Sequence, residues 1–142
     1  MATTSNARTH WEGPLTSGSG TTELVTSGVA TFDVSWAART DSGQGTTNPE
    51  ELVAAALSTC FSMALSHALA GNDTPPASLD TEVGVTFVPG TGITGATIKV
   101  TGDVPGLDAE QFQKFAEDTK VNCPVSKALA GVDKTLEAVF VG

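Results

Sequence analysis

The segment from Leu52 to Ala70 runs for 19 residues without a formal charge, and it constrains the fold more than any other part of the chain. Its length is close to what a helix needs to cross a lipid bilayer. The segment is, however, rich in alanine, contains several polar residues, and has no basic flank that would set an orientation in a membrane. We therefore expect a helix buried inside the protein and no membrane span.

Residues on both sides of this segment predict where the helix starts and stops. Asn48 can cap the first turn, Pro49 suits the first helical position, and acidic residues follow at positions 50 and 51, where the helix dipole favours negative charge. Gly71 is a typical C-terminal stop. The sequence thus predicts one long helix that begins after Asn48 and ends at Gly71.

Strand patterns surround this helix on both sides. Alternating apolar residues and turn formers predict three strands before it, a hairpin after it and a last strand near the end, at residues 10–15, 21–25, 29–36, 83–87, 98–100 and 136–140. A second helix should start at Asp108, which can form a capping box with Gln111, and should break at Pro124 before a short helical piece that ends at Gly131. The order predicts an α+β fold with a largely antiparallel sheet, in a single domain of residues 1–142.

Charge and composition indicate which partners and which location to expect. The chain has 16 acidic and 7 basic residues, a net charge of -9, and no basic run, so nucleic acid is not an expected partner. Charged residues make up only 16% of the chain, which suggests that another subunit covers part of the surface. The first ten residues are polar and contain no apolar run, so we expect a cytoplasmic protein without an export signal.

The chain has two cysteines, Cys60 within the apolar helix and Cys123 directly before Pro124. In a reducing compartment, such an isolated pair is redox-active, catalytic or inert more often than it is a permanent disulfide. A thiol reacts as its thiolate, so Cys60 in an apolar helix needs a nearby cation, whereas Cys123 would gain from a helix N-terminus if Asn122 caps the short helical piece. The residues alone leave open which thiol reacts first, or whether both are simply small buried side chains.

Arg39 is the best-placed cation for Cys60, because it precedes the loop that leads into the long helix, although a solvated loop charge is the simpler interpretation. Glu50 has an ordinary role as a first-turn acid, and its functional alternative is a bidentate pair with a guanidinium. Ten residues separate Glu50 from Cys60, about 15 Å along a helix. If these residues cooperate, the natural arrangement is a two-fold dimer in which the helix start of one subunit meets the thiol of the other.

The remaining candidate ligands do not form a recognisable site. His67 lies about 10 Å beyond Cys60 along the same helix, and His10 falls on a predicted strand, so the cysteines and histidines match no metal-ligand spacing. The glycine-rich loops are typical of hairpins and not of phosphate-binding motifs. We therefore expect no metal ion and no other cofactor.

Two segments resemble a known protein family. TNPEELVAAALSTCFSMALS at residues 47–66 is similar to the first-cysteine helix of the OsmC/Ohr family, the osmotically inducible and organic hydroperoxide resistance proteins. VNCPVSKAL at residues 121–129 is similar to the second-cysteine segment of that family. HWEG at residues 10–13 and DVPGLDA at residues 103–109 resemble the OsmC branch. The resemblance spans nearly the whole chain, and the two cysteine motifs in this order are specific.

The resemblance implies an OsmC-like fold, an intertwined homodimer with active sites at the subunit interface, and a thiol-dependent peroxidase. Such enzymes reduce organic hydroperoxides and, more weakly, hydrogen peroxide. Position by position, Cys60 matches the attacking cysteine, Cys123 the resolving cysteine, Glu50 the carboxylate of the site, and Arg39 the arginine of the OsmC branch. The resemblance further implies a Cys60 sulfenic acid, a Cys60–Cys123 disulfide, and an external dithiol reductant such as a lipoyl protein.

Two other functions compete with this one. A stress-induced protein could bind a small apolar ligand in the same interface cavity, with its thiols incidental. A cysteine hydrolase ranks lower, because no base is expected within reach of Cys60. For the peroxidase, four apolar side chains are expected to line the site and to favour alkyl or lipid hydroperoxides, namely Phe61, Met63, Phe112 and Phe115.

Overall fold

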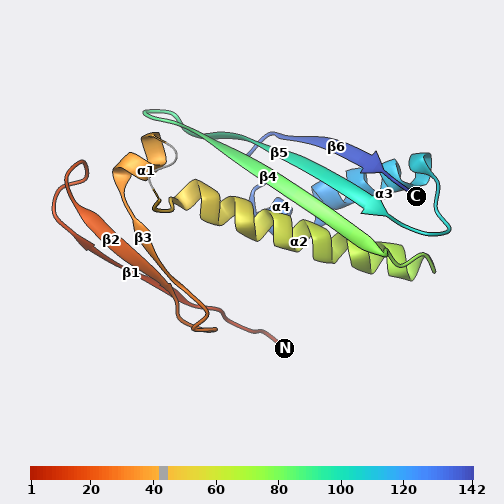
Figure 1. Cartoon of the computed structure of the whole chain (residues 1–142), viewed down its shortest axis with the longest axis horizontal. Coiled ribbons are helices and arrows are strands. Elements are labelled where there is room, and N and C mark those ends of the chain that lie inside the picture. The colour runs from red at the N-terminus through yellow and green to blue at the C-terminus, as the bar shows by residue number, and fades with distance from the viewer. Residues whose placement is uncertain (42–44) are drawn as a thin grey trace. The chain divides into compact units, whose positions relative to one another are not determined.

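The computed structural model describes residues 1–41 and 45–142, which form two three-stranded sheets and four helices (Figure 1). The chain divides into two compact units, Met1–Leu52 and Val53–Gly142. The predicted α+β class and the predicted order of strands and helices are confirmed, with one additional short helix before the long one.

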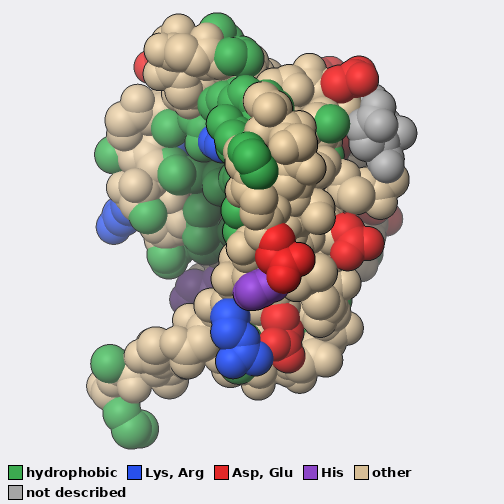
Figure 2. Space-filling view, turned by 90° about the vertical axis from the view of Figure 1, so that its left-hand side faces the viewer, with side chains coloured by type: hydrophobic (Ala, Val, Ile, Leu, Met, Phe, Trp, Pro, Cys, Tyr) green, Lys and Arg blue, Asp and Glu red, His purple; other side chains and the backbone are tan. Residues whose placement is uncertain are grey.

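The first unit contains an antiparallel sheet with the strand order β1-β2-β3, formed by β1 (Ala7–Glu12), β2 (Ser19–Leu24) and β3 (Thr31–Val34). The first hairpin turns earlier than predicted, because Gly13 adopts a φ of 89° and Pro14 follows it, so β1 ends at Glu12. An exposed ion pair of Arg8 with Glu23 and a hydrogen bond between His10 and Glu12 lie on this hairpin. Figure 2 shows charged and histidine side chains gathered on the lower part of one face.

The predicted strand at residues 29–36 is shorter, because a helix interrupts it. Trp36 begins α1 (Trp36–Thr40), and the Ser35 hydroxyl accepts a hydrogen bond from the backbone N–H of Ala38 at 3.2 Å. Ser35 is thus an N-cap, and its capping outweighs the alternation of Phe32, Val34 and Trp36 that predicted a longer strand. The predicted loop at residues 40–47 lies partly outside the described residues.

The long helix α2 (Pro49–Gly71) confirms the predicted start and stop. Asn48 caps it, since its side-chain oxygen accepts the backbone N–H of Glu51 at 2.8 Å. Among the described residues α2 alone is long and apolar enough to cross a membrane, a test that a helix packed inside a water-soluble protein also passes. After α2 come β4 (Ser78–Val88) and β5 (Gly92–Asp103), which form the predicted hairpin.

The second unit has the sheet order β4-β5-β6, and its last strand runs parallel to its neighbour. A connection through α3 (Ala109–Asn122) and α4 (Pro124–Ala128) joins β5 to β6 (Lys134–Phe140). The Asp108–Gln111 capping box at the start of α3 is confirmed, and so is the break at Pro124. The sheets are therefore largely antiparallel, with one parallel pair that the helical connection makes possible.

One stripe of α2 forms the centre of the hydrophobic core. Its members recur every fourth residue, which places them on one helical face, and they are Leu57, Phe61, Leu65 and Leu69. They cluster with buried side chains of β5 and α3, namely Ala96, Ile98, Val100, Phe112 and Ala116. The other side of α2 stays exposed in the single chain, including Ala55, Ala56, Thr59 and Met63. The expected burial of the whole helix thus holds for one face only.

Gly102 is the place on β5 where Phe112 of α3 packs against the strand, so a substitution there tests this contact. A Cβ atom at this position would overlap the ring of Phe112, which is buried in the core. We expect Gly102→Ala to lower the free energy of unfolding by about 1–3 kcal/mol through overpacking. Gly95→Ala is the matched control on the same strand, because its Cβ would lie 3.6 Å from the Asp133 carbonyl oxygen, an ordinary contact. Urea unfolding of both variants checks this, and equal stabilities would contradict it.

Candidate active site

The two thiols lie side by side in the second unit. Cys60 is half-buried on α2 and packs against the core, while Cys123 is only 1% exposed and sits between α3 and α4. Both are free cysteines. Cys60 packs against the cluster that contains Cys123, and the two thiols are near enough for Cys123 to affect the pKa of Cys60. Two residues 63 positions apart in the sequence are therefore brought together by the fold, as a disulfide-forming pair requires.

The break between α3 and α4 determines the position of Cys123. Because Pro124 follows, Cys123 takes an extended backbone with φ -64° and ψ 144°, which ends α3 and begins α4. Cys123 itself is the N-cap of α4, so the predicted capping role of Asn122 is wrong, and Asn122 is the last residue of α3. The physical reason is that the residue before a proline is the one driven out of the helical conformation.

The sulfur of Cys123 has two hydrogen-bond partners on one residue. Its thiol donates to the hydroxyl oxygen of Ser126 at 3.2 Å, and its Sγ accepts the backbone N–H of Ser126 at 3.4 Å. Ser126 is itself buried. Reasoning from the sequence did not single out Ser126, although its position three residues after a helix cap is where a capping partner is found.

Burial raises the pKa of the Cys60 thiol above its usual range, and this is the largest effect on that group. A hydrogen bond from the backbone N–H of Val125 acts in the opposite direction and lowers the pKa. The neighbouring Cys123 raises the pKa of Cys60 through a hydrogen bond and through charge repulsion. Cys60 thus remains largely protonated near neutral pH unless a cation is brought to it.

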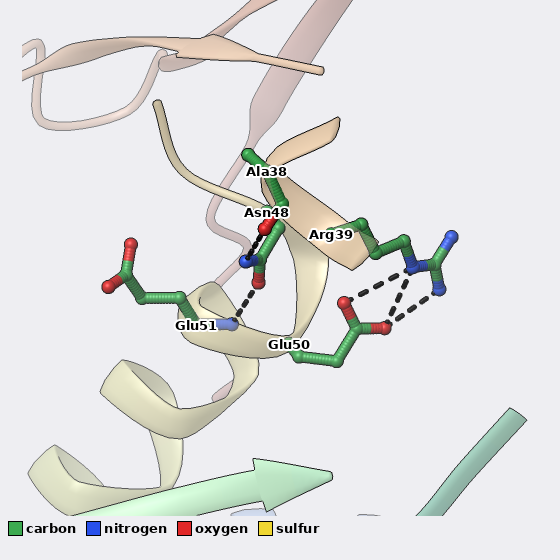
Figure 3. A network of polar contacts seen from close by, with 5 residues as sticks. All are labelled: Ala38, Arg39, Asn48, Glu50 and Glu51. Atoms are coloured by element: carbon green, nitrogen blue, oxygen red, sulfur yellow. Dashed lines mark hydrogen bonds and ion pairs between the residues drawn. The ribbon is translucent and has the colours of Figure 1, made fainter. Parts of the chain in front are cut away.

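Arg39 and Glu50 form a bidentate ion pair in the first unit (Figure 3). The Nε atom of Arg39 donates to both carboxylate oxygens of Glu50 at 3.0 and 3.2 Å, and a terminal guanidinium nitrogen donates to Oε1 at 2.8 Å. Glu50 is only 5% exposed, and the guanidinium lies 6.0 Å from the centre of the Trp36 ring. Arg39 is therefore a fixed charge on α1, and such a paired geometry suits the binding of an anion or a polar oxygen.

Asn48 holds the two partners of this pair in place. While its oxygen caps α2, its side-chain nitrogen donates to the backbone carbonyl of Ala38 at 2.8 Å (Figure 3). The end of α1 is thereby tied to the start of α2, and these are the helices that carry Arg39 and Glu50. The sequence identified Asn48 only as a cap; an asparagine differs from a serine or aspartate cap in having this second group to donate.

A cavity of about 360 Å³ lies beside Arg39 within the first unit. Most of its lining is apolar, and the large side chains among the lining residues are Trp11, Leu15, Trp36 and Leu52. The expectation that Phe61 and Phe112 line the site is wrong, because both are fully buried in the core. Phe115 packs partly against that core, and Met63 is 69% exposed on α2.

Neither histidine joins the two pairs. His67 is exposed on α2, and His10 lies beside Glu12 on β1. Within residues 1–41 and 45–142, no three His, Cys, Asp or Glu side chains are grouped closely enough to hold a metal ion. The chemistry-bearing residues are thus the thiol pair in the second unit and the ion pair in the first.

Removing the sulfur of Cys123 should make Cys60 more acidic. In the Cys123→Ala variant, both effects through which Cys123 raises the pKa of Cys60 are lost, while the Val125 N–H remains. We expect the pH profile for alkylation of Cys60 by iodoacetamide to move to lower pH than in the reduced wild-type chain, with Cys60 followed by peptide mass spectrometry. A profile that stays in place or moves to higher pH would contradict this account of the site.

Comparison with known proteins identifies the family. Residues 41–137 match the family described as OsmC-like protein. The chain is 37% identical over 123 residues to Peroxiredoxin OsmC of Escherichia coli, which covers 84% of this chain and 85% of that protein.

Solved structures agree with this match. An organic hydroperoxide resistance protein OsmC from Legionella pneumophila has a TM-score of 0.75 and 26% identity, covering 99% of both chains. The organic hydroperoxide resistance protein OhrB of Bacillus subtilis has a TM-score of 0.65 and 30% identity, covering 94% of this chain and 97% of that one. With both cysteine motifs on an α+β scaffold of this topology, the chain belongs to the OsmC/Ohr family.

Proposed function

We propose that this chain is a thiol-dependent peroxidase that reduces organic hydroperoxides, and hydrogen peroxide more weakly, to alcohols or water. The observation that carries the proposal is the pair of free thiols, Cys60 and Cys123, which are neighbours beside the helix break. The names of the relatives, a peroxiredoxin and organic hydroperoxide resistance proteins, support the same chemistry. We take residues 1–142 to be a single peroxidase domain that works in the cytoplasm.

In the first step, the thiolate of Cys60 attacks the outer oxygen of the hydroperoxide. The O–O bond breaks, the sulfur becomes a sulfenic acid, and the other oxygen leaves as an alkoxide that takes up a proton to give the alcohol. Because burial raises the pKa of Cys60, the step needs a cation, and Arg39 oriented by Glu50 supplies a fixed one. The same guanidinium stabilises the negative charge on the leaving oxygen.

In the second step, Cys123 attacks the sulfenic sulfur of Cys60, forms the disulfide and releases water. This protects Cys60 from oxidation to sulfinic acid. An external dithiol then reopens the disulfide by exchange and leaves as its own disulfide, which restores both thiols. A lipoyl group has the required dithiol chemistry. None of these steps calls for a metal ion or an organic cofactor.

A homodimer would bring the ion pair of one copy to the thiol pair of the other. The first unit has little core of its own, since Ala38 is the only hydrophobic residue of its described part that is buried. Large apolar side chains of this unit remain exposed, and they include Trp11, Leu15, Val25 and Val29. A three-stranded sheet needs an apolar face packed against something to be stable. The exposed alanine-rich face of α2 likewise needs a cover, and a second copy supplies both surfaces.

The cavity beside Arg39 supports organic hydroperoxides as the preferred substrates. Tryptophan and leucine side chains dominate its large lining residues, so an alkyl or aryl group would be bound there in preference to water. The same cavity is what favours the second candidate function, a protein that binds a small apolar ligand with its thiols incidental. The two functions differ in whether peroxide consumes the thiols.

Thiol titration separates the two functions. With one equivalent of cumene hydroperoxide per chain, we expect the wild-type protein to lose two thiols, dithiothreitol to restore them, and hydrogen peroxide to act more slowly. Cys60→Ser should lose all peroxide reduction, whereas Cys123→Ser should complete a first turnover and then accumulate sulfinic acid under excess peroxide. Retention of both thiols would favour the binding protein, and full turnover by Cys60→Ser would refute the proposed role of that residue.

Mixed dimers test whether the site is shared between copies. Arg39→Ala and Cys60→Ser each lack one half of the proposed site, so each alone should be nearly inactive. If Arg39 of one copy serves Cys60 of the other, a heterodimer of the two variants contains one intact site, and mixing them should restore about half of the wild-type activity per heterodimer. No recovery on mixing, with heterodimers confirmed by native mass spectrometry, would place both halves in the same copy.

A further inference from the structure

We propose that Ser126 is a positioning residue for the resolving step, which holds the sulfur of Cys123 ready to attack the sulfenic acid of Cys60. This inference rests on the proposed peroxidase function and concerns only its second step. Ser126 is neither one of the two cysteines nor a member of the Arg39–Glu50 pair. Its contact with the sulfur of Cys123 follows from the geometry of the helix break.

The hydroxyl and the backbone N–H of Ser126 are both directed at one sulfur atom. The hydroxyl oxygen accepts the proton of the Cys123 thiol at 3.2 Å, and the backbone N–H donates to the same Sγ at 3.4 Å. The backbone bond would form with any residue at this position, since it is the ordinary capping bond of α4. The hydroxyl bond requires the serine side chain, so it is the part of the contact that the amino-acid type determines.

The burial of Ser126 and Cys123 indicates why a serine stands at this position. Ser126 is 2% exposed and Cys123 is 1% exposed, so water has little access to either group. A buried hydroxyl without a partner is costly, and a thiol is a weak donor and acceptor that rarely repays that cost by itself. A serine at this position is therefore better explained by its hydrogen bond to the sulfur of Cys123 than by packing, because an alanine would fill the same space.

The direction of the hydrogen bonds prepares Cys123 for attack. Because its proton points to Ser126, lone-pair density of the sulfur remains available to other neighbours, and Cys60 is such a neighbour in the same packed cluster. When Cys123 attacks, its sulfur bonds to the sulfur of Cys60, the S–O bond of the sulfenic acid breaks, and the thiol proton leaves with the hydroxyl as water. The serine hydroxyl can rotate as the proton departs and donate its own hydrogen to the sulfur, which stabilises the developing negative charge.

The experiment compares Ser126→Ala with two other variants. Ser126→Thr keeps the hydroxyl, and Thr119→Val is a matched control. Thr119 is also buried, and its hydroxyl donates to the Phe115 carbonyl at 2.8 Å, so the control removes a buried hydroxyl from α3 without touching a sulfur. After one equivalent of cumene hydroperoxide, trapping with dimedone reports the sulfenic acid of Cys60, and loss of the second thiol reports disulfide formation.

We expect Ser126→Ala to form the sulfenic acid at the wild-type rate but to form the disulfide about tenfold more slowly, and to accumulate sulfinic acid under excess peroxide. Ser126→Thr should recover most of the wild-type rate, and Thr119→Val should match the wild type in both steps.

Two results would overturn the inference while leaving the proposed function intact: equal disulfide rates in wild type and Ser126→Ala, or an equal slowing in Thr119→Val, which would point to general loosening of the helix pair. A Ser126→Thr variant as slow as Ser126→Ala would also count against it. If the wild-type chain itself keeps both thiols in the presence of peroxide, the proposed function fails first, and that result is seen before any variant is compared.

Discussion

The packing of one α2 stripe against the second sheet is the contact on which the other features depend. Leu57, Phe61, Leu65 and Leu69 are fully buried together with side chains of β5 and α3, and each large apolar side chain buried in this way contributes about 1.5–3 kcal/mol. The stripe also fixes the rotation of α2 about its axis. Cys60 directly precedes Phe61, so once Phe61 is buried, the Cys60 thiol is held beside the α3–α4 break.

The proline at position 124 determines how the two helices present their backbone to the thiols. Pro124 forces Cys123 into an extended conformation, and the backbone N–H groups that open α4 then face sulfur atoms: that of Ser126 faces Cys123, and that of Val125 faces Cys60. The Arg39–Glu50 ion pair of the first unit also depends on a residue at a helix end. Asn48 caps one helix and binds the end of another, so that Arg39 and Glu50 meet with bidentate geometry.

Local signals in the sequence were sufficient for the parts of the fold that depend on neighbouring residues. Asn48, Pro49 and Gly71 defined α2, and Asp108 with Gln111 defined the start of α3, because caps act over three or four residues. Where two local signals competed, as at Trp36, the alternation predicted a strand while the Ser35 cap produced a helix. The parallel pairing of β6 and the burial of Phe61 and Phe112 depend on contacts distant in sequence, which no local pattern contains. The sequence and its motifs already offered Cys60, Cys123, Arg39 and Glu50 and their pairing, because those residues stand out by type and position. The contacts of Ser126 with Cys123 depend on the geometry of the helix break, which the structure supplies.

The parallel alignment of β5 and β6 has a consequence for the order in which the chain matures. Parallel neighbours cannot pair until the connection between them has folded over the sheet, and this long-range closure is among the slower events of folding. Cys123 lies within that connection, whereas Cys60 lies on a helix that precedes the whole sheet. The two sulfurs therefore meet only once this connection has packed beside α2. The closeness of Cys60 and Cys123 is thus a property of the folded chain, and a nascent or heat-damaged molecule lacks it.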